Sequence, residues 1–192
     1  MSKTGLFFGS FNPVHIGHLA IANYFVEFTD LDQLWFVVSP QNPLKKKSTL
    51  LNDHHRLHLL ELAINDSPLF RISDIEFKLP KPSYTIDTLT YLQEKFPNMK
   101  FSLIMGSDGL DSFSKWKNYQ VILNNYEIYV YPRPGLLKSD FLKQENIHLI
   151  DAPQMEVSSS FIRKAIANGK DIRHFLAPEV YNYIIEMNFY RK

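Results

Sequence analysis

The chain has 192 residues, of which 45% are hydrophobic and 14% aromatic, which is enough for one domain with a full core. Its formal net charge of +1 argues against broad nucleic-acid binding, which needs a basic face, but suits small anionic substrates. The absence of cysteine excludes disulfides, thiolate metal sites and cysteine catalysis. The N-terminal apolar run is too short for a signal peptide, and no stretch approaches the roughly 20 apolar residues of a membrane span, so we expect a cytoplasmic protein.

Residues 5–19 predict a strand, a tight loop and the start of a helix, because an apolar run is followed by Gly-Ser, Asn-Pro and a helical pattern. His15 and His18 are three residues apart, so their rings share one face of the first helical turn. That turn also leaves backbone N–H groups unpaired at the positive end of the helix dipole. Gly9 suits a backbone that a phosphate approaches closely, and Gly17 keeps side-chain bulk away from the histidines. We therefore expect an anion site here.

The next segments predict a β-α-β unit and a helix after it. The apolar run 34–39 completes the unit, and in parallel sheets of this kind ligands bind beyond the carboxyl ends of the strands. The loop 41–51 then carries three lysines, and either Lys45 or Lys46 is the candidate to reach a triphosphate. Asp53 is the expected N-cap of the following helix. We interpret the histidines and the arginine there as surface residues, with the arginine a weak phosphate candidate: His54, His55, Arg56 and His58.

The middle of the chain predicts further alternating strands and helices. Residues 70–79 fit one or two short strands, and Ser83 or Thr85 is expected to cap the next helix. The apolar run 101–105 ends in Gly106-Ser107-Asp108, where a carboxylate can contact a ligand or cap a helix. Trp116 offers a stacking surface for a flat ring, although a core position is the commoner explanation for a single aromatic residue.

The last third predicts strands over 127–131 and 147–150, a short helix over 138–145 and a final helix over 178–187. Serines before residue 161 can cap a helix that begins near 159, and Arg163 lies one turn further in. Hydroxyls, free amides and a guanidinium there would form a second phosphate clamp.

Two motifs resemble the signatures of the nucleotidylyltransferase superfamily. Residues 9–18 are similar to its Gly-Thr-Phe-Asp-Pro-x-His-x-Gly-His motif, with Ser10 and Asn12 where Thr and Asp are common. Residues 159–163 are similar to its second signature. Four further segments look like the bacterial nicotinate-mononucleotide adenylyltransferases: residues 83–89, 106–110, 116–117 and 133–135. The combination is specific, whereas each segment alone would be weak.

The resemblance implies a single α/β domain over residues 1–192, with a Rossmann-like, doubly wound parallel sheet flanked by helices and a helical C-terminal part from about 158. It implies adenylyl transfer from ATP to nicotinate mononucleotide, with Mg²⁺ carried by ATP and no protein side chain as metal ligand. The residues expected to act in catalysis are His15, His18, Lys45 and Arg163. Those expected to bind ATP are Gly9, Ser10, Phe11, His15, His18, Gly106, Asp108, Arg133, Ser159, Ser160 and Arg163. Those expected to bind nicotinate mononucleotide are Ser10, Lys45, Tyr84, Thr85, Asp108 and Trp116.

Other functions remain open at this point. The acceptor is alternatively phosphopantetheine or the amide form of the mononucleotide, although the phosphopantetheine enzymes usually have Thr in place of His15. A cytidylyltransferase is less favoured. A nucleotide sensor without turnover is a different class of function, and Asn12 and the Lys45 segment are the features that would support it.

Overall fold

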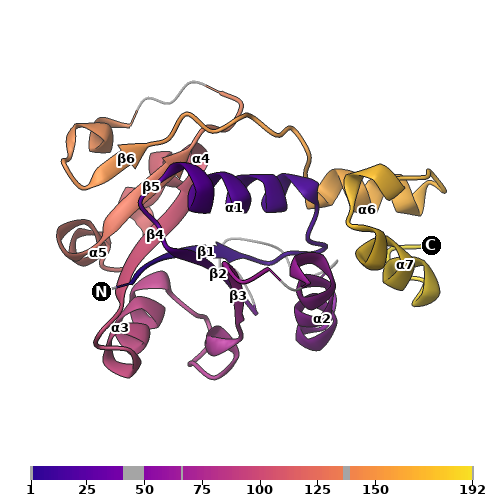
Figure 1. The fold of residues 1–192 in the computed structure, drawn as a ribbon, viewed down its shortest axis with the longest axis horizontal. Coiled ribbons are helices and arrows are strands. Elements are labelled where there is room, and N and C mark those ends of the chain that lie inside the picture. The colour runs from indigo at the N-terminus through magenta and orange to yellow at the C-terminus, as the bar shows by residue number, and fades with distance from the viewer. Residues whose placement is uncertain (1, 41–49, 66, 136–138, 192) are drawn as a thin grey trace.

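The structure is a computed structural model, and it describes residues 2–40, 50–65, 67–135 and 139–191. A six-stranded parallel sheet with strand order β3-β2-β1-β4-β5-β6 forms its centre (Figure 1). The strands are β1 Lys3–Gly9, β2 Gln33–Val38, β3 Phe70–Ser73, β4 Lys100–Gly106, β5 Glu127–Tyr131 and β6 Ile147–Leu149. The chain winds outward from β1 in both directions, which confirms the predicted doubly wound α/β fold.

Helices cover both faces of the sheet (Figure 1). The α-helices are α1 Ile16–Phe28, α2 Asp53–Ile64, α3 Thr85–Lys95, α4 Ser107–Asp111, α5 Tyr119–Asn125, α6 Ser159–Ala167 and α7 Pro178–Glu186. Of the one or two short strands expected over 70–79, one forms (β3) and residues 75–77 make a 3₁₀ turn; the short helix expected over 138–145 is a 3₁₀ helix over residues 140–143. Residues 75–77 leave the sheet because the Phe77 N–H turns back to the carbonyl oxygen of Asp74.

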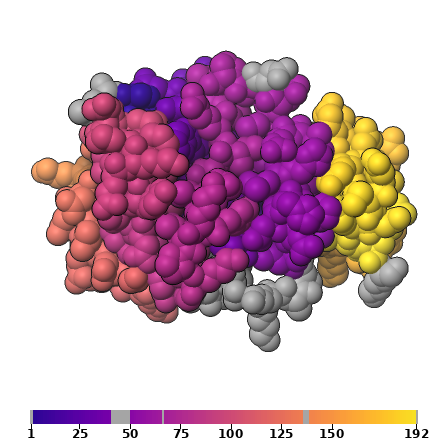
Figure 2. Space-filling model, turned by 90° about the horizontal axis from the view of Figure 1, so that it is seen from below, coloured from indigo at the N-terminus to yellow at the C-terminus, as the bar shows by residue number. Residues whose placement is uncertain are grey.

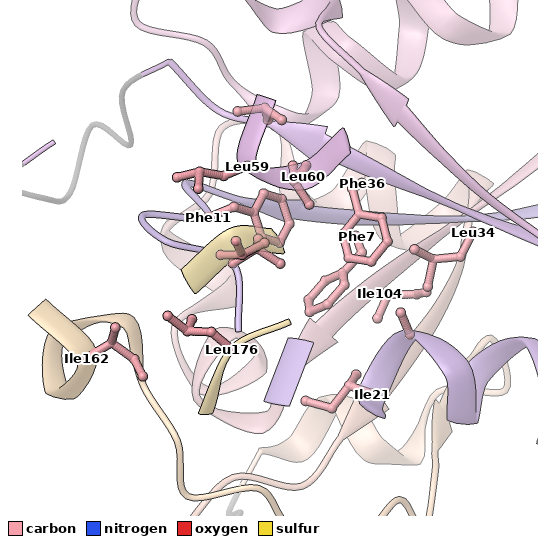
Figure 3. Packing of buried hydrophobic residues seen from close by; sticks show 14 of the residues in the cluster. Phe7, Phe11, Ile21, Leu34, Phe36, Leu59, Leu60, Ile104, Ile162 and Leu176 are labelled. Atoms are coloured by element: carbon pink, nitrogen blue, oxygen red, sulfur yellow. The ribbon is translucent and has the colours of Figure 1, made fainter. Parts of the chain in front are cut away.

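Alternation along the strands divides the core into two clusters. Leu34, Phe36 and Val38 of β2 face α1 and α2, whereas Trp35 and Val37 face α3. This is the period of two that a strand imposes on its side chains, with both faces buried as in other parallel sheets. Figure 3 shows the first cluster, in which side chains from the sheet meet side chains of α1, α2 and α6 and of the segment before α7: Ile21, Leu59, Leu60, Ile162 and Leu176.

The C-terminal helices pack against α2 at one end of the sheet (Figure 1; yellow beside purple in Figure 2). His55 Nδ1 lies 2.9 Å from the hydroxyl of Tyr183 on α7, and the His55 ring contacts that of Phe189 with centroids 4.7 Å apart. The predicted surface position was therefore wrong for His55, which lies in this interface together with His58. Among the described residues, no group of histidines and carboxylates could hold a metal ion, and no helix is long and apolar enough to cross a membrane.

Candidate functional site

A cleft of about 590 Å³ opens at the carboxyl ends of the strands, where the order of the sheet reverses between β1 and β4. This is the edge at which ligands bind in open parallel sheets. The cleft brings together eight residues predicted as site residues, from the ends of β1, β4 and β5, the start of α3 and the segment after α4: Gly9, Ser10, Tyr84, Thr85, Gly106, Asp108, Trp116 and Arg133. The predicted candidates Lys45 and Lys46 lie outside the described residues.

The two histidines stand where the sequence places them, at the start of α1. His15 is only 4% exposed, and its ring lies over that of His18 with centroids 3.8 Å apart. The backbone N–H of His15 donates to Nδ1 of the His18 ring over 3.3 Å, so a neutral His18 carries its ring proton on Nε2. Burial, aided by the charge of Arg133, lowers the pKa of His15 to about 4. His15 is therefore neutral at pH 7 and offers one ring N–H to an anion.

Two buried nitrogen atoms of the site have no hydrogen-bond partner in the part of the chain that the structure describes. They are Nδ1 of His15 and Nε of Arg133. The Arg133 Nε lies 3.9 Å from Oδ1 of Asp108, which is too far for a hydrogen bond. Because buried polar groups are normally paired, these atoms indicate a polar ligand that completes the site. Arg133 lines the cleft, whereas His15 and His18 do not.

The tight packing of the loop after β1 explains its small residues. A Cβ atom on Gly9 would lie 2.7 Å from the ring of Phe11, and one on Gly17 would lie 3.1 Å from Nδ1 of His15. Phe11 itself is 1% exposed, with its ring 5.1 Å from that of His18. The Phe11 side chain therefore packs against His18 and is not exposed to a ligand.

The second signature lies beside the first, but its side chains hold the loop. Ser159 Oγ donates to the carbonyl oxygen of Pro13 over 2.9 Å, and Nη1 of Arg163 donates to that of Asn12 over 2.7 Å. Nη2 of Arg163 donates to Oγ of Ser160. The Ser158 side chain caps α6 by accepting from the Phe161 N–H, as predicted for this run of serines. None of these four residues lines the cleft, so Arg163 keeps only its remaining N–H groups for a phosphate.

Arg56 was wrongly predicted to lie at the surface. It is fully buried, and its guanidinium donates to the carbonyl oxygens of Ser10 (2.7 Å), Ser39 (2.8 Å) and Leu51 (3.1 Å). Its fourth partner is the carboxylate of Asp53, which was expected to cap α2, whereas Asn52 holds the N-cap position. Arg56 thus fixes the carboxyl ends of β1 and β2, where two walls of the cleft meet.

Glu76 is a cleft residue that the sequence reasoning missed. It is 2% exposed, and its carboxylate accepts hydrogen bonds from the hydroxyls of Ser83 (3.1 Å) and Thr88 (2.9 Å). Because Ser83 bonds Glu76, it does not cap α3. Tyr84 is the N-cap residue, and its side chain makes no cap hydrogen bond, so the predicted cap by Ser83 or Thr85 was wrong. The sequence gives no clear signal for Glu76, because it stands among other charged residues, Asp74 and Lys78, in a segment that alternates with apolar ones.

The opposite wall of the cleft presents aromatic rings. Trp116 is half-buried, with its ring 5.5 Å from that of Phe113, and it lines the cleft. The Lys117 ammonium lies 4.7 Å from the centroid of the Tyr84 ring and pairs with Asp87 on α3 at 2.9 Å. The start of α3 and the segment around Trp116 are thereby joined across the cleft.

Comparisons with known proteins agree with this geometry. The family model described as "Cytidylyltransferase-like" matches residues 6–165. Proteins named "Probable nicotinate-nucleotide adenylyltransferase" include one from Flavobacterium psychrophilum, 57% identical over 99% of this chain and 100% of its own length, and one from Bacteroides fragilis, 51% identical over 96% and 92%. The nicotinic acid mononucleotide adenylyltransferase of Plasmodium falciparum, solved with NaAD, has the same fold at a TM-score of 0.82, with 24% identity over 99% of this chain and 98% of its own.

Proposed function

The chain belongs to the cytidylyltransferase-like family and, within it, to the nicotinate-nucleotide adenylyltransferases, and we propose from its cleft how it transfers the adenylyl group of ATP to nicotinate mononucleotide. A phosphate oxygen of the mononucleotide attacks the α-phosphorus of ATP. The bond from that phosphorus to the bridging oxygen breaks, and pyrophosphate leaves with its electron pair. The attacking phosphate is already an anion at neutral pH, so the reaction needs no protein base and no covalent intermediate.

Catalysis in this proposal rests on alignment and charge neutralisation. His15 and His18 donate ring N–H groups to the phosphate oxygens of ATP, and Arg133 neutralises charge from the β5 side. The first-turn amides of α1, and Gly9 and Ser10 after β1, receive the phosphates closely. Lys45 and the remaining N–H groups of Arg163 complete the clamp. Ser159 and Ser160 support it, Phe11 lies beneath it, and Gly106 and Asp108 lie between the two substrates.

The acceptor lies at the start of α3. The uncapped first turn of that helix offers N–H groups and a positive dipole end to the carboxylate of the pyridine ring, and Trp116 stacks on the ring. A neutral carboxamide gains less from the dipole. We therefore expect the enzyme to prefer the acid to the amide, with Tyr84 and Thr85 forming the wall of the ring pocket.

The divalent ion enters with its substrate. Nucleotidyltransferases of this kind use a divalent metal with ATP, and Mg²⁺ bridging the phosphate oxygens is our proposal for this chain. The proposal also includes a cytoplasmic location and one domain over residues 1–192, whose helical C-terminal part begins near residue 158.

The observation that carries this proposal is the pair of buried, unpartnered nitrogens of His15 and Arg133 at the switch point of the sheet. The test is pyrophosphate release by the purified protein with Mg²⁺-ATP and nicotinate mononucleotide, nicotinamide mononucleotide or phosphopantetheine, each in parallel. We expect strong turnover with nicotinate mononucleotide alone. Turnover with another acceptor would keep the phosphate clamp and overturn the acceptor pocket, whereas ATP binding without turnover would favour a sensor.

A further inference from the structure

The loop between β1 and α1 is held in place by three side chains from two distant helices, α2 and α6. Its carbonyl oxygens at Ser10, Asn12 and Pro13 accept from Arg56, Arg163 and Ser159, which lie 46, 151 and 146 residues away. The loop also buries the side-chain amide of Asn12, which is 3% exposed and makes hydrogen bonds of its own. The position of the histidines therefore depends on how well this loop is anchored.

The Asn12 side chain faces the C-terminal segment. Its Oδ1 accepts from the hydroxyl of Tyr190 over 2.8 Å and from the N–H of Leu51 over 3.2 Å. Two donors on one oxygen identify that atom as the carbonyl oxygen of the amide. Asn12 occupies the position at which the superfamily motif usually carries Asp, and the two contacts to its Oδ1 require an acceptor, which both residues supply.

Tyr190 is suited to be a permanent donor. Burial raises the pKa of its hydroxyl, and the charges of Arg163 and Arg56 oppose that change only in part. The hydroxyl therefore stays protonated at neutral pH and donates to Asn12 Oδ1. The residue adopts a φ of 64°, in the left-handed region, which side chains other than glycine rarely adopt. Such a conformation persists where surrounding contacts hold it.

We propose that Tyr190 is a positioning residue of the nucleotide site, whose hydroxyl fixes Asn12 and thereby the loop that leads into His15 and His18. This role for Tyr190 rests on the proposed function in one respect, because the proposed function places ATP on that loop. It assigns the C-terminal segment a part in ATP binding, at a residue that does not line the cleft.

A simpler role for Tyr190 is to secure the C-terminal helices to the rest of the molecule. The chain provides a matched control for that role in Tyr183, whose hydroxyl contacts Nδ1 of His55 on α2 at 2.9 Å. Both tyrosines join the C-terminal part to the remainder through a hydroxyl (Figure 2 shows this junction). Only the Tyr190 hydroxyl bonds the loop.

The experiment compares Tyr190→Phe with Tyr183→Phe in the full chain. The readouts are the Kd for Mg²⁺-ATP by calorimetry, the KM of each substrate and the thermal midpoint. We expect Tyr190→Phe to weaken ATP binding roughly 5- to 10-fold, as for the loss of one buried hydrogen bond, with the KM of nicotinate mononucleotide unchanged. Tyr183→Phe should leave the Kd for Mg²⁺-ATP within about twofold of wild type, although its thermal midpoint should shift about as much as that of Tyr190→Phe. Equal ATP binding by the two variants would overturn the proposal.

A mutant cycle tests whether Tyr190 acts through Asn12. Asn12→Ala should weaken ATP binding at least as much as Tyr190→Phe, and the double variant should be no worse than Asn12→Ala alone. Asn12→Asp should restore most of the binding, because the carboxylate keeps the acceptor. Additive losses, or an Asp variant as weak as the Ala variant, would contradict the proposal. Failure of the proposed function is distinct, since it would abolish pyrophosphate release by the wild-type protein while the ATP-binding comparison stays interpretable.

Discussion

The two ends of the cleft are built differently. At the proposed nucleotide end, Arg56, Ser159 and Arg163 bond backbone carbonyls of one loop, and the Arg56 side chain is fully buried there. At the acceptor end, the start of α3 is uncapped, and Trp116 is only half-buried beside the exposed pair of Lys117 and Asp87. Under the proposed function, the triphosphate meets a loop fixed through its backbone, whereas the acceptor meets side chains and free amides. Substitutions at the first end should affect stability and catalysis, and those at the second should affect acceptor choice.

The largest effect is expected from Arg56→Met. The substitution leaves three carbonyl oxygens and the Asp53 carboxylate without their donor, which should lower the free energy of unfolding by about 3–5 kcal/mol. Urea unfolding followed by circular dichroism measures it. Arg71→Met, at an exposed arginine on β3, is the control and should cost less than about 0.5 kcal/mol. If Arg56→Met lowered the free energy of unfolding by less than about 1 kcal/mol, the loop between β1 and α1 would not depend on the buried Arg56 guanidinium.

His15 should make stability depend on pH. Its pKa of about 4 in the folded protein lies below the ordinary value of 6.5, so the unfolded chain binds more protons between these values. The free energy of unfolding is therefore unaffected by His15 protonation above pH 6.5. It decreases as the pH falls from 6.5 towards 4, by roughly 3 kcal/mol over the whole window. Urea unfolding of wild type and His15→Gln at pH 7.0, 5.5 and 4.5 tests this. The difference between the two proteins should shift with pH, and parallel curves would refute the buried, neutral His15.

His18→Ala should lower kcat by roughly 100-fold or more, because it removes one preorganised donor to the phosphates. Stopped-assay pyrophosphate release measures the change, and His174→Ala, at an exposed histidine on a 3₁₀ turn, should leave kcat unaltered. A His18 variant with full kcat would remove His18 from the catalytic residues.

Trp116→Ala tests the acceptor end of the cleft and has the smallest expected effect. Loss of the stacking surface should raise the KM of nicotinate mononucleotide roughly 3- to 10-fold and leave the KM of ATP unchanged. Trp116→Phe keeps a flat ring and should recover most of the loss. If both KM values rise together in the Ala variant, Trp116 supports the cleft as a whole, and the two ends are not independent.

The sequence predicted the parts whose partners are local. The strand, turn and helix around His15 and His18 follow from adjacent residues, and so does the serine cap of α6. The burial of Arg56 was not predicted, because its partners are carbonyl oxygens up to 46 residues away, and no side-chain pattern in the sequence indicates them. Ser83 was assigned to the wrong bond because a buried carboxylate, Glu76, competes for its hydroxyl. Long-range bonds to backbone atoms and buried polar side chains are decided by the tertiary structure.

The order in which the chain is made has a consequence for the loop between β1 and α1. Strand β1 lies in the middle of the sheet and leaves the ribosome first, but the donors Ser159, Arg163 and Tyr190 emerge more than 140 residues later. During synthesis the sheet can therefore assemble while the loop between β1 and α1 still lacks three of the four side chains that hold it, Arg56 being the one already made. A nascent chain should acquire secondary structure well before it acquires affinity for ATP.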